Sequence, residues 1–126
     1  MPLEALKGLN MDSILNSVKA MLGITPDYDP FDNELIMHIN SVFMVLHQLG
    51  VGPSERFEIE GADEEWSDFL KGGTKLGLVK SYMYLKVRQL FDPPTSGGAL
   101  EAIDRQIKEF EWRLNVEVET PSLQGE

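Results

Sequence analysis

The sequence has no cysteine among its 126 residues. This absence excludes a disulfide framework, a thiolate zinc site and a cysteine nucleophile. No apolar run reaches the roughly 18–20 residues that are needed to span a bilayer, so we expect no membrane partner. The opening residues, MPLEALKGLN, lack a basic region followed by an apolar stretch, and we therefore expect no secretory signal. Synthesis in a cytoplasm is the simplest interpretation.

Basic residues are scarce. The 11 Lys and Arg residues stand against 21 Asp and Glu residues and give a formal net charge of −10. Such a charge argues against direct nucleic-acid binding, because that function requires basic surface. Three interpretations of the acidity remain open. The charge keeps the protein soluble, or it imitates DNA in front of a DNA-binding partner, or it lines a passage through which DNA slides without sticking.

The residue patterns of common catalytic sites are also missing. His38 and His47 are nine residues apart on one predicted helix. This spacing places them on opposite sides, so they cannot form an i, i+4 metal pair. The segment KGGTKLG lacks the ordered spacing of a P-loop, and no serine sits in a nucleophile-elbow motif. We therefore expect no enzymatic activity, no cofactor and no bound metal.

What the sequence does contain is helical periodicity within one domain's length. Asp12 is the predicted N-cap of a first helix, which ends at Gly23. Phe57–Glu60 is predicted as one short strand in an irregular connection. Helices are predicted for residues 13–22, 31–49, 64–70, 75–91 and 98–115. The fold class is therefore all-α, a small antiparallel bundle of four to five helices with a C-terminal αα-hairpin and an extended C-terminal tail.

Three of these helices have predicted core stripes. On each stripe the apolar residues fall within one face at 100° per residue. The stripes contain Ile14, Leu15, Val18, Met21 and Leu22 in the first helix, Phe31, Leu35, Ile36, Ile39, Val42, Phe43, Leu46 and Leu49 in the second, and Ala99, Leu100, Ile103, Ile107, Phe110 and Leu114 in the last.

Several large side chains lie away from these stripes. Trp112 falls on the polar side of the last helix beside Arg105 and Lys108, and Met37 and Met44 lie opposite the core face of the second helix. The indole either covers the tail and the stems of its basic neighbours or contacts another protein. The methionines either fill gaps or form an adaptable contact surface.

The helix predicted for residues 75–91 is apolar around more than half of its circumference. Such a helix is buried on several sides. It is either the central helix of the bundle or a helix that is partly covered by another subunit. On the second interpretation the candidate interface residues of the chain are Trp112, Arg105, Lys108, Met37, Met44, Tyr82, Tyr84 and Arg88.

Charge is segregated along the chain. Residues 71–91 contain five basic residues and no acidic one. The preceding run contains seven acidic residues, namely Glu55, Glu58, Glu60, Asp63, Glu64, Glu65 and Asp68. This acidic run either pairs within the molecule, stays solvated, faces a DNA channel, or meets the basic helix of a neighbouring subunit in a head-to-tail contact.

The stretch VKSYMYLKVRQLFDPPTSGGALEAIDRQIKEFEWRLN resembles the head–tail connector (adaptor) proteins of long-tailed bacteriophages and prophages. A short helix ending in LGI, an Asp/Pro turn and a long apolar helix from near Asp32 are similar as well, so the resemblance covers about residues 12–116. LFDPP and EWRL carry its most specific part.

The resemblance implies a virion protein that has no catalytic site and is assembled in the host cytoplasm. It implies a homo-oligomeric ring, expected to be dodecameric on the portal, that extends the DNA channel and carries the next neck or tail-completion protein. We expect a helical connector domain at 1–115 and a tail at 116–126 that reaches toward the portal through Val116, Val118 and Leu123. The alternative function is an acidic DNA mimic that inhibits or regulates a basic host protein.

Overall fold

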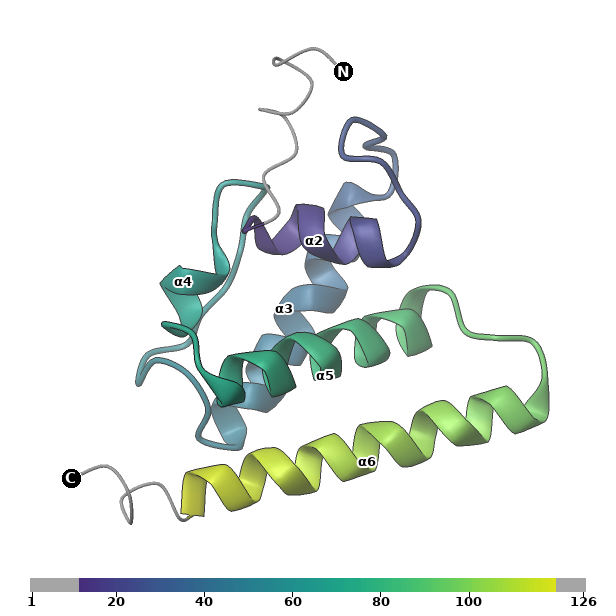
Figure 1. Cartoon of the computed structure of the whole chain (residues 1–126). Coiled ribbons are helices and arrows are strands. Elements are labelled where there is room, and N and C mark those ends of the chain that lie inside the picture. Colours follow the sequence, from purple (N-terminus) through teal and green to yellow (C-terminus); the bar gives the residue numbers. More distant parts are fainter. Residues whose placement is uncertain (1–11, 120–126) are drawn as a thin grey trace.

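The computed structural model describes residues 12–119, which fold into helices packed around one core (Figure 1). The described part of the chain contains no strand, so the predicted all-α class is confirmed. Residues 12–119 contain the helices α2 (Ile14–Met21), α3 (Asp32–Gln48), α4 (Trp66–Phe69), α5 (Thr74–Phe91) and α6 (Gly97–Glu119).

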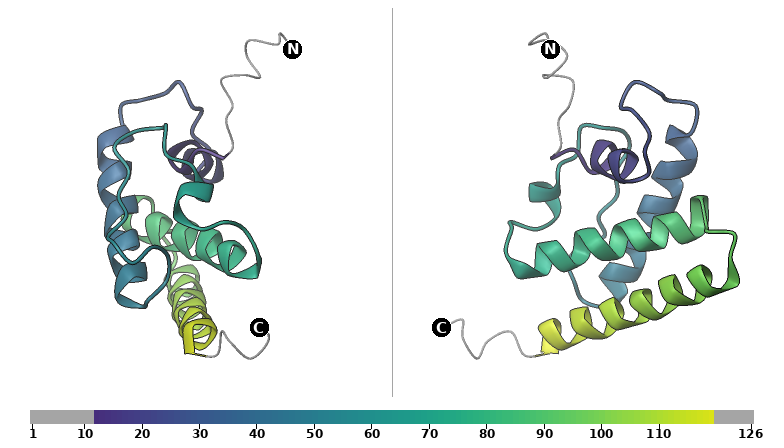
Figure 2. Two further views of the ribbon diagram at one scale, coloured as in Figure 1. Left: turned by 90° about the vertical axis from the view of Figure 1, so that its left-hand side faces the viewer. Right: turned by 45° about the vertical axis from the view of Figure 1, so that its right-hand side comes forward.

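Helix α5 is the central helix of the bundle. It packs against α2, α3 and α6, and Val79, Tyr82, Met83 and Val87 on it are fully buried. Figures 1 and 2 show α3 crossing α5 on one side, while α6 runs along α5 on the side away from α2. The apolar circumference of α5 is therefore explained by packing within the chain. The predicted C-terminal αα-hairpin is confirmed as α5 and α6.

The ends of the first two helices follow from capping. Ser13 is the N-cap of α2, because its Oγ accepts a hydrogen bond of 3.2 Å from the Asn16 amide. The prediction of Asp12 was thus wrong by one residue. Gly23 and Gly50 follow α2 and α3 with φ of 82° and 83°, a conformation that glycine adopts without a Cβ penalty. The predicted stops at both glycines are confirmed.

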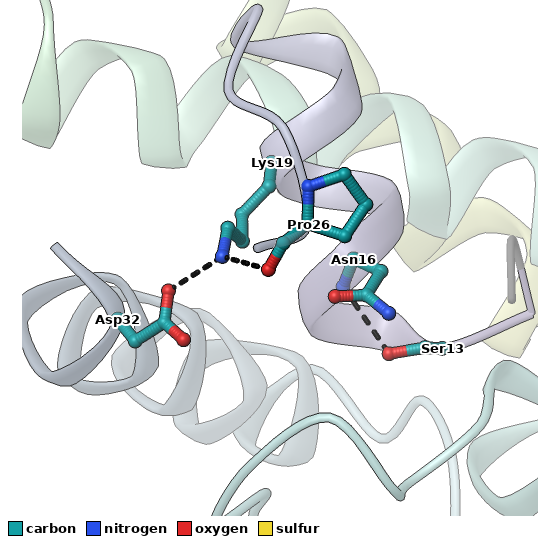
Figure 3. Close-up of polar contacts among 5 residues, drawn as sticks. All are labelled: Ser13, Asn16, Lys19, Pro26 and Asp32. Atoms are coloured by element: carbon teal, nitrogen blue, oxygen red, sulfur yellow. Dashed lines mark hydrogen bonds and ion pairs between the residues drawn. The ribbon is translucent and has the colours of Figure 1, made fainter. Parts of the chain in front are cut away.

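The connection from α2 to α3 is held by a buried lysine (Figure 3). The Lys19 side chain is 1% exposed, and its Nζ lies 2.8 Å from Asp32 Oδ1. The same ammonium group donates a 2.9 Å hydrogen bond to the Pro26 carbonyl. A buried ammonium group is tolerated only when it is paired and hydrogen-bonded. Lys19 therefore ties the connection of residues 22–31 to α2 and to the start of α3.

The strand predicted for Phe57–Glu60 is wrong. Asn40 of α3 binds both backbone groups of Ile59: Nδ2 donates to the carbonyl at 3.0 Å, and Oδ1 accepts from the amide at 2.8 Å. These bonds satisfy the polar groups that a strand ladder would otherwise satisfy. The segment thus stays irregular, while Phe57 packs edge-to-face on Phe43 at 5.0 Å between ring centroids.

The end of the last helix was also predicted wrongly. The VEVE segment was expected to begin an extended tail at residue 116, yet α6 continues to Glu119. Val118 follows the buried Leu114 by one helical turn and packs against the core. Its methyl groups lie over Gly50, where an added Cβ would be 3.4 Å from Val118 Cγ1. Leu123 lies outside the described residues, and the division of the chain at 115/116 stays a prediction.

Candidate interaction surface

Within residues 12–119, the structure brings no three His, Cys, Asp or Glu residues into a group that could hold a metal ion. In the same range, none of the helices is long and apolar enough to cross a membrane. His38 lies 3.3 Å from Glu34 on its own helix and does not approach His47. Several large apolar side chains of residues 12–119 are exposed, and exposed apolar side chains are suited to protein contacts.

Trp112 is exposed on the outer side of α6. Its side chain is 66% exposed, whereas Ile107 and Leu114 on the opposite side of the helix are buried. Arg105, Lys108 and Trp112 share one face, because residues three, four and seven apart lie above one another on a helix. Arg105 and Lys108 are exposed as well. The indole is thus accessible to a partner, which is the position that the periodicity predicted.

A second exposed apolar surface lies on α3. Met37 is 64% exposed and Met44 is 41% exposed. Their spacing of seven residues places them two turns apart on one side of the helix. The methionines belong to α3 and Trp112 belongs to α6, and these two helices lie on different sides of α5 (Figure 2).

Tyr82 does not belong to any contact surface, and its selection as an interface residue was wrong. Its side chain is fully buried between α5 and α6. The phenol donates a 2.7 Å hydrogen bond to Glu111 Oε2. Burial, followed by this bond and the charge of Glu111, raises the pKa of Tyr82 well above its usual value of 10.0. Tyr82 is a structural link between the two helices of the hairpin.

Tyr84 and Arg88 face a groove between α2 and α5, which we call the α2–α5 groove. Its central part has a volume of about 370 Å³ and is lined by Ser17, Val18, Met21, Trp66, Lys80, Ser81 and Tyr84. A continuation toward the end of α5 shares Met21 and Tyr84 and adds Leu22, Arg88 and Asp92. Arg88 Nη1 donates to the Tyr84 hydroxyl at 3.3 Å.

Met21 was assigned to the core by the sequence, but it is 59% exposed at the edge of this groove. It occupies the last turn of α2, where the neighbouring chain turns away into the connection. Phe31, also assigned to a core stripe, is 39% exposed. Helical periodicity did not separate these end residues from buried ones, because it describes direction around a helix and not the depth of cover.

The acidic run between residues 55 and 68 contains carboxylates that bind backbone amides and carboxylates on exposed residues that do not. Glu64 accepts hydrogen bonds from the amides of Glu60 and Gly61, at 2.8 and 3.4 Å. Asp68 accepts a 2.8 Å bond from the Glu65 amide, and Glu65 completes this capping box. Three of the seven carboxylates thus hold the backbone of their own segment. The other four, on exposed residues, are Glu55, Glu58, Glu60 and Asp63.

The basic residues around α5 are not used to neutralise this run. Among residues 12–119, the ion pairs join Lys19 to Asp32, His38 to Glu34, Lys108 to Asp104 and Arg113 to Glu109. Lys80 instead lies over the Trp66 ring at 5.8 Å from its centroid. Intramolecular pairing between the acidic run and the basic helix, one of the alternatives left by the sequence, is therefore absent from the described residues.

A family model described as phage connector protein matches residues 14–121. No curated protein and no solved structure matches the chain significantly. The matched range begins at the first residue of α2 and covers every helix described above. The chain therefore belongs to the phage connector protein family.

Proposed function

We propose that this protein is a non-enzymatic component of the phage neck that forms a ring on the portal protein at the capsid vertex. The ring extends the DNA channel and carries the next neck or tail-completion protein. The observation that carries this proposal is the family match over residues 14–121. The protein would be made in the host cytoplasm and incorporated into the virion during assembly.

The distribution of exposed apolar residues supports a ring. A subunit in a closed ring contacts its two neighbours through two different surfaces. The chain offers such surfaces on different sides of α5, with Met37 and Met44 on α3 and Trp112 on α6. A ring on the portal must also bind components above and below it, so exposed residues on several sides are expected. We propose twelve subunits for the ring on the portal.

The four exposed carboxylates of the acidic run would face the channel. Packaged DNA carries one negative charge per roughly 1.7 Å of helix axis. Carboxylates along the wall repel these phosphates and keep the DNA from adhering. Glu64, Glu65 and Asp68 bind backbone amides of their own segment, so their carboxylates contribute less to the repulsion of DNA. Their hydrogen bonds fix the backbone of the segment that carries the four exposed carboxylates.

Portal contact is assigned to the end of the chain. Val118 packs against its own domain, so it is less suited to this contact than we expected from the sequence. Val116 is partly exposed at the end of α6, and we propose that it and Leu123 reach the portal. No cofactor is required for any of these contacts.

The experiment that tests this function is a binding assay with purified portal rings. Sedimentation of the full chain with the portal, at salt concentrations from low to physiological, supports the connector function. The alternative DNA mimic predicts strongly salt-dependent binding to a basic host protein and no portal binding. That alternative is weakened by the three carboxylates that bind backbone amides of their own segment, because a mimic needs its carboxylates free.

A further inference from the structure

We infer that the connection of residues 23–31, called here the acidic loop, docks into the α2–α5 groove of the neighbouring subunit. The inference rests on the proposed ring and adds a contact between neighbouring subunits to the surfaces named above. One side of this contact is acidic and aromatic, and the other is basic and apolar. The partner is therefore a second copy of this chain, joined head to tail.

The acidic loop carries aromatic rings on an exposed ridge. Tyr28 is 50% exposed and Phe31 is 39% exposed. Phe31 stacks edge-to-face on Phe91, with ring centroids 5.2 Å apart, and its ring lies 5.8 Å from that of Tyr28. Half-exposed aromatic residues supported from behind by other rings are typical of contact hot spots.

Acidic residues flank these rings. Asp27 and Asp29 are exposed, and within residues 12–119 neither is a partner in the four ion pairs of the structure. Their charges are thus available to an external cation. A partner surface for this ridge should offer an apolar hollow with lysine or arginine beside it.

The ridge is fixed before any partner arrives. Lys19 holds the Pro26 carbonyl at 2.9 Å and the Asp32 carboxylate at 2.8 Å, one on each side of the aromatic residue Tyr28. Pro26 and Pro30 further restrict the backbone. A loop that is already ordered loses less conformational entropy on binding than a free one. The buried lysine therefore supports recognition as well as folding.

The α2–α5 groove has the complementary properties. Met21 provides exposed apolar surface beside the buried Trp66, and Lys80 is an exposed residue of the groove lining. Lys80 makes no ion pair among the described residues, so its charge is available in the central part of the groove. In the continuation of the groove, Arg88 lies together with Asp92. The central volume of about 370 Å³ is at the lower end of the range for pockets that hold a bound group. It suits one or two side chains of a ridge.

Other parts of the chain fit the groove less well. Trp112 stands beside Arg105 and Lys108, whose charges would oppose Lys80. The acidic run already borders its own groove, since Ser67 and Asp68 line its far end together with Trp66 and Lys80. The acidic loop is the exposed segment that combines aromatic rings with free carboxylates. Loop and groove are different surfaces of one subunit, so the contact is heterologous and can propagate around a ring.

The absence of native cysteine makes this contact testable by cross-linking. The variant Tyr28→Cys/Lys80→Cys of the full chain is assembled on the portal in particles and then treated with a short bismaleimide. We expect a ladder of covalent oligomers, because each subunit supplies one cysteine to each neighbour. Each single variant should give no ladder. The matched control is Tyr28→Cys/Gln106→Cys, which places the second cysteine on an exposed position of α6 away from the Trp112 face and should also give none.

Particles that contain the double variant but yield no ladder would overturn the docking and leave the connector function intact. A dimer from Tyr28→Cys alone would overturn it too, because that product indicates a symmetric contact. If the unsubstituted chain is absent from particles, the proposed function fails, and the inference fails with it.

A charge exchange provides a second test that does not depend on cysteine geometry. Asp27→Lys/Asp29→Lys and Lys80→Glu should each lower the amount of chain recovered on portal rings, by at least about tenfold. Their combination should restore most of the recovery. Equal recovery of all variants would contradict the contact. It would also be contradicted if the chain that carries all three substitutions were recovered as poorly as the loop variant or the Lys80→Glu variant.

Discussion

The ammonium group of Lys19 lies 2.8 Å from the carboxylate of Asp32, and the lysine side chain is almost completely removed from solvent. This pair joins the end of α2 to the first residue of α3. The connection between them thus keeps one conformation while its aromatic residues stay exposed. A single buried charge links the stability of the domain to the shape of its proposed contact surface.

Removal of the Asp32 carboxylate should lower the free energy of unfolding. The substitution Asp32→Ala removes the side-chain oxygens and leaves a buried ammonium group with the Pro26 carbonyl as its remaining partner among the described residues. A broken buried pair costs roughly 3–5 kcal/mol, and we expect about 2–3 kcal/mol here because the Asp32 side chain is 27% exposed. Denaturant unfolding measures this loss. The control Lys108→Met breaks an exposed pair and should change stability by at most about 0.5 kcal/mol; similar losses in both variants would contradict the account.

Tyr82→Phe tests the link between α5 and α6. Loss of the 2.7 Å hydrogen bond to Glu111 should lower stability by about 1–2 kcal/mol at neutral pH. Because the pKa of Tyr82 is raised in the folded state above its usual value of 10.0, the unfolded chain releases this proton first. Folding stability should therefore fall as the pH rises above about 10.

The same variant supplies the control for the pH effect. Tyr82→Phe lacks the group that titrates, so its stability should fall less between pH 9 and pH 11 than that of the unsubstituted chain. Lysines and the other tyrosines contribute equally to both proteins. Urea unfolding at a series of pH values gives the comparison, and parallel curves would show that Tyr82 ionises as readily in the folded state as in the unfolded one.

Trp112→Ala should separate folding from assembly. The side chain is 66% exposed, so the helicity and melting temperature of the isolated chain should hardly change. Recovery on portal rings should fall, because an exposed tryptophan is a typical contact hot spot. The comparison variant is Trp66→Ala, which removes a ring that is 2% exposed and should cost about 3–5 kcal/mol. Unfolding of Trp112→Ala would assign this residue to the core instead.

Neutralising the exposed carboxylates of the acidic run tests whether this run faces the DNA channel. We would replace Glu55, Glu58 and Glu60 by Gln and Asp63 by Asn, and retain the three carboxylates that bind backbone amides. Particles with this variant should assemble normally but package or eject DNA more slowly, since the wall no longer repels phosphate. The control is Glu101→Gln/Glu117→Gln on α6. Unchanged packaging and ejection in the four-residue variant would count against a channel position for this run.

The sequence predicted the helices well, because apolar periodicity and glycine stops are local signals. It failed where a distant residue decides the local structure. Ile59 stays outside a strand because Asn40, nineteen residues away, binds its backbone. The VEVE segment satisfies both a helical and an extended pattern. Contact of Val118 with Gly50 and continuity with Leu114 favour the helix.

The candidate surface was predicted only in part. The off-stripe positions of Trp112, Met37 and Met44 already indicated exposure, and the structure confirms it. Tyr82 could not be separated from Tyr84, because α5 is apolar on most of its circumference and only its neighbours define the buried side. Nothing in the sequence indicated that Lys19 would be buried and paired. Its importance depends on Asp32 and Pro26, which approach it only after folding.

We propose that the chain is a structural part of the virion neck. The most direct test is to purify DNA-filled particles and quantify this 14.2 kDa chain against the portal protein by mass spectrometry. We expect near-equal copy numbers, with the chain retained after washes that remove loosely bound protein. Absence from the particles, with abundant free chain in the lysate, would contradict it.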